Sequence, residues 1–388
     1  MIALSILFAL GCFGLLTSTV FAGMVLAGAR FHLRSQHEKS RTDFTPPLSL
    51  LKPLHGAEPG LEANLATFFE QEYPEFEILF CARTDDDAGL EMARRVAARY
   101  PHVAARFFCA GERRMANAKA QSMEVMAQAA RCEILVVSDS DVRVRPEYLR
   151  AVATEFADER VGAMTCLYRG VAAEGGLWSR LEAVGMSVEM TAGVLVANML
   201  EGMRFVLGPT MAFRAEALRQ MGGFAVTADY CADDFVLGSK AFEQGWKVAL
   251  SPHAIDHIVL HARFVASLRH QTRWMKSTRF SRPKGHFGTA LTFSMPFALV
   301  ACGAALALHR PALALATLAW GVLTRVAIAW AAGRRVVGDR SWLNMLVLYP
   351  LRDLMGFGFW AASYLSDKVL WRGRVYRLLP GGRMEAAD

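Results

Sequence analysis

The sequence predicts an α/β domain with a parallel sheet, placed between an N-terminal membrane helix and a C-terminal membrane region. Three observations lead to this fold class. Strand-like and helix-like segments alternate through the middle of the chain, apolar residues gather at its two ends, and acidic clusters follow apolar strands. Strands that alternate with helices are typical of βαβ units. Because ligands bind at the carboxyl ends of such strands, the acidic clusters are the first candidates for a functional site.

Composition sets the class of protein before any motif is considered. The chain has 388 residues, of which 53% are hydrophobic and only 20% are charged, and its formal net charge is +7. This length allows two or three domains at roughly 150 residues each. Such a composition excludes a disordered tail, a collagen and a small disulfide-rich scaffold. The seven cysteines are scattered and form no CxxC pair, so we expect reduced thiols that face the cytosol.

Residues 1–29 form the predicted N-terminal transmembrane helix, because they carry no charged side chain. At about 1.5 Å per residue, a helix of this length exceeds the roughly 30 Å hydrocarbon core of a bilayer. A cleaved signal peptide is the alternative, but no basic residue precedes the apolar run. Basic residues are in excess in 30–45, which predicts a cytosolic linker and places the long middle of the chain in the cytosol.

Residues 286–366 form the predicted C-terminal transmembrane or re-entrant region. Two apolar runs, 287–308 and 312–332, are joined by a very short connection, which predicts an antiparallel hairpin. The next run, 342–365, contains Arg352-Asp353 at its centre, where an unpaired charge would be costly. This run either spans with the pair turned toward protein or re-enters, and the basic tail 367–388 favours re-entry under the positive-inside rule.

The segment 46–285 is the predicted α/β domain. We expect strands at 48–54, 77–82, 103–109 and 133–138, and helices at 60–72, 88–99, 116–130 and 236–245. A further apolar segment, 177–200, has two equally supported interpretations. It is either a core helix of the domain or a helix at the membrane surface that delivers lipid to the site.

Two acidic clusters follow strands of this sheet. Asp85-Asp86-Asp87 comes after the second strand and fits a helix N-cap as well as a ligand site. Asp139 and Asp141 follow the fourth strand, and residues i and i+2 of extended backbone point the same way. Two such carboxylates can hold one divalent ion that also bridges two phosphates, and an all-oxygen ligand set predicts Mg²⁺ or Mn²⁺.

Three later groups complete the candidates. Asp233-Asp234 precedes a helix-like segment and is either an N-cap or a general base that takes a proton from a hydroxyl. A histidine recurs every four residues at His253, His257 and His261. On a helix this spacing would allow a zinc site. Alternatively, one of these histidines completes the ligand shell of the catalytic metal. His270-Gln271-Thr272-Arg273-Trp274 opens a basic stretch that fits an interfacial anchor or a diphosphate and acceptor site.

These motifs, in this order, resemble the membrane-bound glycosyltransferases of family two and their ceramide glucosyltransferase branch. The resemblance covers most of the chain and includes KPLHGAEPGLEANLATFFEQEYPEFEILFC, DSDVRV, RWMKSTRFSRP and LWRGRVYRLLPGG. The bacterial hopanoid-biosynthesis-associated glycosyltransferases are similar too. This resemblance implies a GT-A-type, nucleotide-diphospho-sugar transferase fold, which is Rossmann-like.

The resemblance also implies a role for each matching residue. The residues implied to bind the nucleotide sugar are Asp86, Asp87, Lys119, Asp139, Arg273 and Trp274. Asp139 and Asp141 match the metal-binding DxD, and Asp234 matches the catalytic base. Asp233 and His257 are further candidates. His270 stands where the (Q/R)xxRW motif has Gln or Arg, which puts the role of this position in doubt because a neutral imidazole lacks the permanent charge of Arg.

Together these features predict an inverting enzyme that transfers glucose or N-acetylglucosamine from a UDP-sugar to a lipid hydroxyl, such as ceramide or a hopanoid polyol. We expect a multi-pass protein of the inner membrane with its catalytic domain in the cytosol. Basic residues cluster at the membrane boundaries and near the RW motif, so we expect no nucleic-acid partner. The alternatives are a processive polysaccharide synthase and a non-catalytic scaffold or transporter subunit. The identity of the sugar and the lipid and the oligomeric state stay open.

Overall fold

The computed structural model describes residues 1–38, 43–173, 175–260, 263–371 and 373–387. The chain forms two compact units. The α/β unit comprises Gln36–Tyr168, Glu201–Leu260 and Gly382–Asp388, and the helical unit comprises Met1–Ser35, Arg169–Leu200 and His261–Gly381. The predicted division into membrane, linker, catalytic and tail segments stays a prediction, and Lys39 and Arg41 of the basic linker lie outside the described residues. All seven cysteines are free of disulfide bonds.

An eight-stranded sheet in the order β3-β2-β1-β4-β7-β6-β8-β5 is the centre of the α/β fold. Its strands are β1 (Leu48–Pro53), β2 (Phe76–Ala82), β3 (Ala104–Cys109), β4 (Ile134–Ser138), β5 (Val142–Arg143), β6 (Val161–Ala172), β7 (Thr210–Arg214) and β8 (Lys247–Val259). The four predicted strands pair in parallel, as expected. The pairs β4–β7, β6–β7 and β5–β8 are antiparallel, so the predicted parallel sheet is one part of a mixed sheet. Parallel strands need a crossover connection, and α2, α3 and α4 lie in the connections between the first four strands.

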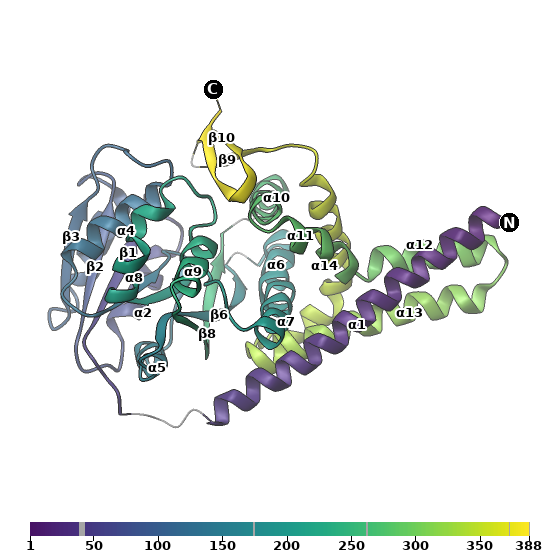
Figure 1. Cartoon of the computed structure of the whole chain (residues 1–388), viewed down its shortest axis with the longest axis horizontal. Coiled ribbons are helices and arrows are strands. Elements are labelled where there is room, and N and C mark those ends of the chain that lie inside the picture. The colour runs from purple at the N-terminus through teal and green to yellow at the C-terminus, as the bar shows by residue number, and fades with distance from the viewer. Residues whose placement is uncertain (39–42, 174, 261–262, 372, 388) are drawn as a thin grey trace. The chain divides into compact units, whose positions relative to one another are not determined.

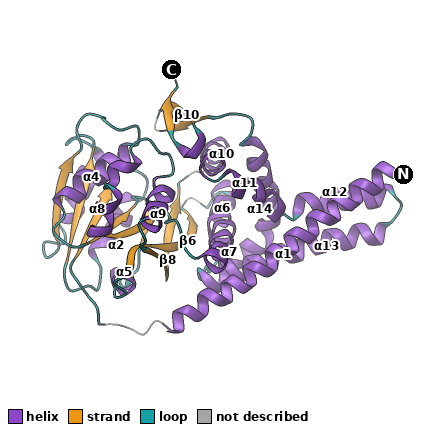
Figure 2. Ribbon diagram, in the orientation of Figure 1, coloured by secondary structure: helices purple, strands orange, loops and turns teal. Residues whose placement is uncertain are grey.

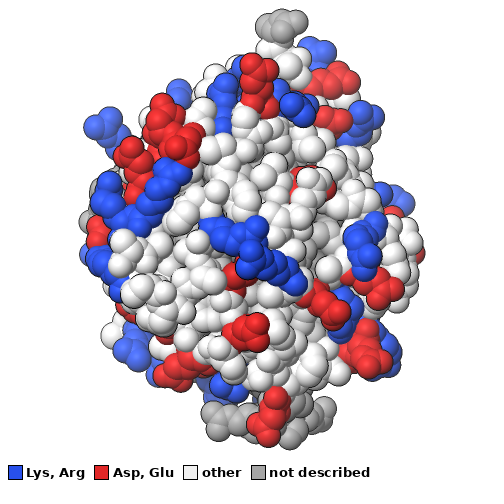
Figure 3. Space-filling model, turned by 90° about the vertical axis from the view of Figure 1, so that its left-hand side faces the viewer, with Lys and Arg blue, Asp and Glu red and all other residues white. Residues whose placement is uncertain are grey.

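Helices cover this sheet, as Figure 2 shows for the α/β unit. They are α2 (Leu61–Phe69), α3 (Ala88–Ala97), α4 (Ala118–Ala129), α5 (Tyr148–Glu155), α8 (Ala215–Met221), the short 3₁₀-helix η2 (Phe224–Thr227) and α9 (Asp233–Glu243), and strand β11 (Met384–Ala386) follows near the C-terminus. Leu65 and Phe68 of α2 are fully buried. Burial of this apolar face stabilises the unit and fixes where each helix begins relative to the sheet edge. On the face in Figure 3, basic and acidic side chains are interspersed around a broad uncharged area.

The helical unit contains the remaining elements. They are α1 (Ile2–Glu38), α6 (Leu177–Val184), the π-helix η1 (Gly185–Met190), α7 (Thr191–Glu201), α10 (Phe264–Ser281), α11 (Pro283–Thr289), η3 (Ala290–Thr292), α12 (Met295–Ala307), α13 (Pro311–Ile328), the π-helix η4 (Ala329–Val336), α14 (Trp342–Ala362), the hairpin of β9 (Lys368–Trp371) and β10 (Arg374–Leu378), and η5 (Pro380–Gly382). Helices α12 and α13 pack together as the predicted hairpin (Figure 1). Leu15 of α1 packs against Ala298 and Ala301 of α12.

Among the residues that the structure describes, three helical segments are long and apolar enough to cross a membrane: Ile2–Ser35, Leu177–Glu201 and Pro311–Val336. The pair Pro283–Thr292 and Met295–Ala307 makes a fourth candidate if this bent pair, with its 46° bend, is one span. We expected an unbroken run over 287–308, but Asp353 accepts hydrogen bonds from the backbone N–H groups of Ser294 (2.9 Å) and Met295 (2.7 Å). These bonds satisfy backbone N–H groups at the start of α12, where a helix has no internal acceptors for them.

Helix α14 turns its central charges toward protein. The Arg325 guanidinium of α13 lies 2.7 Å from the Asp353 carboxylate, and both side chains are buried. Arg352 contacts Glu189 of η1 at 2.9 Å. Each charge therefore has a partner of opposite sign, which buried charges require. Whether 342–365 spans or re-enters stays open.

Candidate functional site

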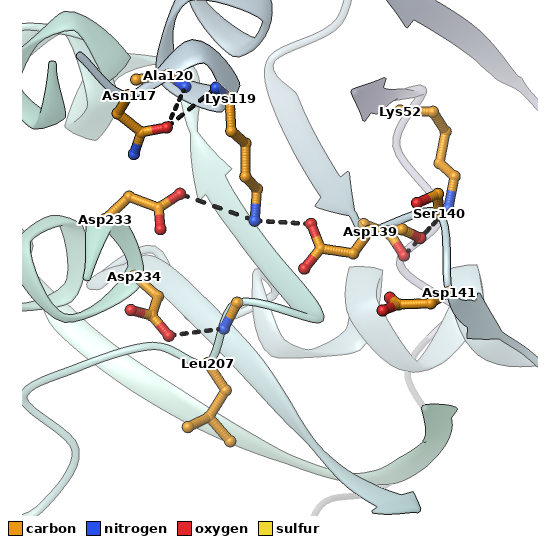
Figure 4. A network of polar contacts seen from close by, with 12 residues as sticks. Lys52, Asn117, Lys119, Ala120, Asp139, Ser140, Asp141, Leu207, Asp233 and Asp234 are labelled. Carbon is orange, nitrogen blue, oxygen red and sulfur yellow. Dashed lines mark hydrogen bonds and ion pairs between the residues drawn. The ribbon is translucent and has the colours of Figure 1, made fainter. Parts of the chain in front are cut away.

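Lys119 lies between two carboxylates that come from distant parts of the α/β unit. Its Nζ is 2.7 Å from Asp139 Oδ1 and 3.7 Å from Asp233 Oδ2, as Figure 4 shows. Lys119 is in the first turn of α4, Asp139 follows β4, and Asp233 opens α9. The fold thus brings together three residues that the sequence singled out separately.

Asn117 fixes the start of α4 and thereby the position of Lys119. Its Oδ1 accepts hydrogen bonds from the backbone N–H groups of Lys119 (3.0 Å) and Ala120 (3.2 Å), which is an N-cap. Its amide donates to the carbonyl oxygen of Tyr230 at 3.1 Å. This side chain is fully buried, so it ties the start of α4 to the loop that leads into α9.

Opposing effects set the charges in this cluster. Burial disfavours the charged form of Lys119, but Asp139 and Asp233 outweigh burial and raise its pKa. Burial also raises the pKa of Asp139, although the Lys119 ammonium opposes that shift. Lys119 therefore stays protonated and supplies a fixed positive charge next to the sheet edge.

Asp234 has the properties of a general base. Burial, together with the neighbouring Asp233, raises the pKa of Asp234 to about 6. Its Oδ2 accepts a hydrogen bond from the backbone N–H of Gly208 at 3.0 Å. A Cβ atom added at Gly208 would lie 3.4 Å from Asp234 Oδ2 and 3.8 Å from Asp139 Oδ2, so the two carboxylates face the same glycine. A carboxylate with a raised pKa accepts a proton more readily at neutral pH than an ordinary one.

Asp141 pairs with His257 rather than with Lys119. Its Oδ2 lies 3.0 Å from His257 Nε2. Burial disfavours the charge on Asp141, but His257 and Lys52 outweigh burial and lower the pKa to about 2. His253 and His257 lie on strand β8, so these two do not share the helix face that a zinc site of this spacing would use, and His261 lies outside the described residues.

The residues around Asp141 fit a hard divalent cation. Asp141 Oδ1 is buried and has no hydrogen-bond partner within the described chain. Across the same described residues, no group of three or more His, Cys, Asp or Glu side chains is arranged to hold a metal ion. Mg²⁺ sites commonly use one or two protein carboxylates and take their other ligands from substrate phosphates and water. Asp141 with His257 suits a metal that enters with a nucleotide.

Lys52 is a residue of this site that the sequence analysis missed. Its Nζ donates a hydrogen bond to the Asp139 carbonyl oxygen at 2.6 Å and lies 3.7 Å from the centre of the Phe68 ring. Figure 4 shows this side chain beside the turn that carries Asp139, Ser140 and Asp141. Burial lowers the pKa of Lys52 to about 7. A lysine inside the apolar strand LSLLKP was the available signal, because lysine is almost never fully buried without a partner.

Asp87 occupies the N-cap of α3 and also holds the loop after β1. Both of its carboxylate oxygens lie 3.0 Å from the backbone N–H of Gly56, and Oδ1 accepts from the N–H of Gly89 at 2.8 Å. Asp87 comes after β2 and Asp139 comes after β4, and β1 lies between these two strands in the sheet. The two residues therefore lie at the same edge of the sheet. Asp86 is exposed beside it. Their nucleotide-binding role stays a prediction.

The His-x-x-Arg-Trp residues lie on α10 in the helical unit, whereas the carboxylates belong to the α/β unit. The rings of His270 and Trp274 are 4.6 Å apart. The guanidinium of Arg273 lies 6.0 Å from the centre of the Trp371 ring of β9. These contacts arrange the motif locally and leave its role toward a ligand as a prediction.

Comparison with known proteins places these residues in a family. Residues 13–384 match glycosyl transferase family 21. Ceramide glucosyltransferase 3 of Caenorhabditis elegans is 24% identical over 360 residues, which cover 90% of this chain and 77% of that protein. Ceramide glucosyltransferase 1 of the same organism is 27% identical over 241 residues, which cover 62% of this chain and 52% of that protein.

Solved structures are also similar over most of the chain. The mannosyltransferase PcManGT from Pyrobaculum calidifontis, in complex with GDP-Man and Mn²⁺, has a TM-score of 0.49 and 19% sequence identity, and the match covers 92% of this chain and 98% of that one. S. aureus TarS in complex with UDP-GlcNAc has a TM-score of 0.42 and 15% identity, with 88% and 100% covered.

Proposed function

The chain belongs to glycosyl transferase family 21, and from that premise we propose that it transfers one sugar from a UDP-sugar to the hydroxyl of a membrane lipid. The observation that carries the proposal is the partly buried cluster in which Lys119 joins Asp139 to Asp233 while Asp234 faces Gly208. Glucose or N-acetylglucosamine is the sugar, and a ceramide or a hopanoid polyol is the acceptor. The names of the two nematode relatives support glucose and ceramide.

Asp234 acts as the general base in this proposal. Its carboxylate takes the proton of the lipid hydroxyl, and the lipid oxygen then forms a bond to the anomeric carbon. The bond between that carbon and the diphosphate oxygen breaks on the opposite face, and its electron pair leaves with UDP. A single displacement of this kind inverts the anomeric configuration. The raised pKa of Asp234, about 6, suits a base that is ionised at neutral pH and still accepts a proton.

The leaving diphosphate needs positive charge, which two parts of the site supply. Asp139 and Asp141 would hold Mg²⁺ or Mn²⁺, with His257 beside Asp141, and the buried Oδ1 of Asp141 supports this assignment. When bound, such an ion neutralises charge on the diphosphate. Lys119 adds a fixed positive charge, and its ion pair positions the Asp139 carboxylate, which is proposed to contact the nucleotide sugar. Lys52 fixes the backbone of the turn after β4 through its hydrogen bond to the Asp139 carbonyl oxygen. Asp86, Asp87, Arg273 and Trp274 are proposed to complete the nucleotide-sugar site.

The membrane supplies the acceptor in this proposal. Three apolar helical segments, or four with the bent pair, support a multi-pass protein. The basic residues after the first helix support a cytosolic α/β unit at the inner membrane, where UDP-sugars are available. The substrate lipid then enters the site from the bilayer.

A product assay tests this function directly. The purified full chain is incubated with vesicles that contain ceramide or a hopanoid polyol, with Mn²⁺ or Mg²⁺ and a panel of UDP-sugars, and the lipids are identified by mass. We expect the acceptor lipid plus one hexose unit. A polymeric product would contradict lipid monoglycosylation and indicate a synthase. Absence of transfer from every donor to every lipid would overturn the proposal.

A further inference from the structure

Asn64 is a polar residue on the buried face of helix α2, where its neighbours are apolar. The side chain is 1% exposed, and the rest of this buried face consists of Leu61, Leu65, Phe68 and Phe69. Asn forms helices less readily than Leu, and burial of an amide costs free energy unless the amide forms hydrogen bonds. We therefore looked for the hydrogen bonds that offset this cost.

Both ends of the Asn64 amide bind the segment that follows β4, within the α/β unit. Its Nδ2 donates a hydrogen bond to the carbonyl oxygen of Ser140 at 3.1 Å, and its Oδ1 accepts one from Arg143 Nε at 2.8 Å. A guanidinium has no acceptor, so the amide oxygen must face Arg143 and the amide nitrogen must face the Ser140 carbonyl. Arg143 thus fixes which end of the amide binds Ser140.

Asn64 and Lys52 together hold two successive peptide groups of Asp139-Ser140-Asp141. Lys52 Nζ donates to the Asp139 carbonyl oxygen at 2.6 Å, and Asn64 binds the next carbonyl along the chain. A peptide group is planar, so a hydrogen bond to its oxygen restrains the whole group. Only the two backbone dihedrals of Ser140 join these two groups. The hydrogen bonds therefore set the directions of the Asp139 and Asp141 side chains relative to each other.

We propose that Asn64 is a positioning residue for the divalent cation of the donor complex, and that Arg143 orients it for this role. Asn64 binds the Ser140 carbonyl so that the Asp139 and Asp141 carboxylates converge on one cation. The inference rests on the proposed function and deepens it. Residues that hold metal ligands in place typically contribute 10- to 100-fold to metal affinity. The Asn64 amide is neutral, so it acts on the cation through the geometry of the turn.

Mn²⁺ binding to Asn64→Ala provides the first test. Electron paramagnetic resonance measures free and bound Mn²⁺ with the full chain in lipid vesicles and saturating UDP. We expect the Kd for Mn²⁺ to rise about 10- to 100-fold, because the turn loses the hydrogen bond that orients its carboxylates. This readout needs no sugar transfer. A folded Asn64→Ala protein with the wild-type Kd would overturn the inference.

Gln71→Ala is the matched control. Gln71 is also buried, and it also binds the backbone beyond β4, because its Nε2 donates to the Arg145 carbonyl oxygen at 3.0 Å and its Oε1 accepts from the Leu149 N–H at 3.1 Å. These contacts lie outside the Asp139-Ser140-Asp141 turn. Gln71→Ala should therefore lower the melting temperature and leave the Kd for Mn²⁺ unchanged. An equal rise in Kd for both variants would contradict a specific role of Asn64.

Arg143→Met tests the same inference even if Asn64→Ala does not fold. Met has no N–H group, so the Asn64 amide loses the partner that orients it. Loss of a positive charge would by itself strengthen the binding of a cation. The inference predicts the opposite, a Kd for Mn²⁺ that rises several-fold. An unchanged or lower Kd in Arg143→Met would refute the role of this pair.

The wild-type protein separates the inference from the proposed function. A wild-type chain that binds Mn²⁺ with UDP and transfers no sugar would refute the proposed function, whereas weaker Mn²⁺ binding by Asn64→Ala would still support the role of Asn64. A wild-type chain that binds no Mn²⁺ in the presence of UDP would overturn the inference itself.

Discussion

Lys119→Met removes the ammonium that lies 2.7 Å from Asp139 and 3.7 Å from Asp233. The Lys119 side chain is only 12% exposed, so water cannot readily replace it. Removal of one partner from a buried ion pair typically costs about 3–5 kcal/mol. Because the Asp139 side chain is 30% exposed and can recover some hydration, we expect the lower end, about 3 kcal/mol. Thermal unfolding of the purified variant measures this loss.

The same substitution should move the pH dependence of transfer. Lys119 lowers the pKa of Asp234, so its loss raises that pKa above about 6. Asp234 works as a base only when ionised, and activity therefore falls as the pH drops through its pKa. The acid limb of kcat/KM should shift to higher pH, and each pKa unit corresponds to about 1.4 kcal/mol. Lys119→Arg keeps the charge and serves as the control. Unchanged melting and an unchanged acid limb in Lys119→Met would refute the reasoning.

Three further outcomes test other parts of the account. Gly208→Ala should fold, because the added Cβ makes ordinary contacts, but it should lower kcat/KM about a hundredfold by filling the space that Asp234 and Asp139 face. Gly193→Ala is the control, because a Cβ added there has nothing within 4 Å. Full activity of Gly208→Ala would contradict the placement of the two carboxylates. Asp87→Ala should cost about 1–2 kcal/mol of stability, measured by thermal unfolding, because α3 loses its N-cap. An unchanged melting temperature would show that the cap is dispensable. Excess EDTA should abolish transfer and added Mn²⁺ or Mg²⁺ should restore it, whereas activity that persists in EDTA would rule out the metal role of Asp141.

The sequence predicted the parallel half of the sheet, in which strands alternate with helices. Strands β1 to β4 alternate with helices, and each was expected within a residue or so of its bounds. Strand β6 was not predicted, because its first eight residues are all buried and it shows no alternation of polar and apolar residues. The histidine spacing was ambiguous for a physical reason. Residues four apart share a face both on a helix and on a strand, so the spacing of His253 and His257 could not separate the two.

The candidate site was predictable where one short motif carries the chemistry. Asp139, Asp141, Asp233 and Asp234 stand in acidic pairs next to predicted element ends, and the fold places them around Lys119 or His257. Residues that act through tertiary contacts gave little signal. Gly208 matters only because two carboxylates face it.

Transfer by Asp234→Asn measures the central claim most directly. Asn has nearly the shape of Asp, so its amide oxygen should still accept the hydrogen bond from the Gly208 N–H. Asn lacks the carboxylate that takes the proton of the lipid hydroxyl. With the product lipid identified by mass, we predict that kcat falls about 10²- to 10⁴-fold and that the KM for the UDP-sugar changes little. A purified Asp234→Asn protein that forms the glycolipid at the wild-type rate would contradict the assignment of Asp234 as the base.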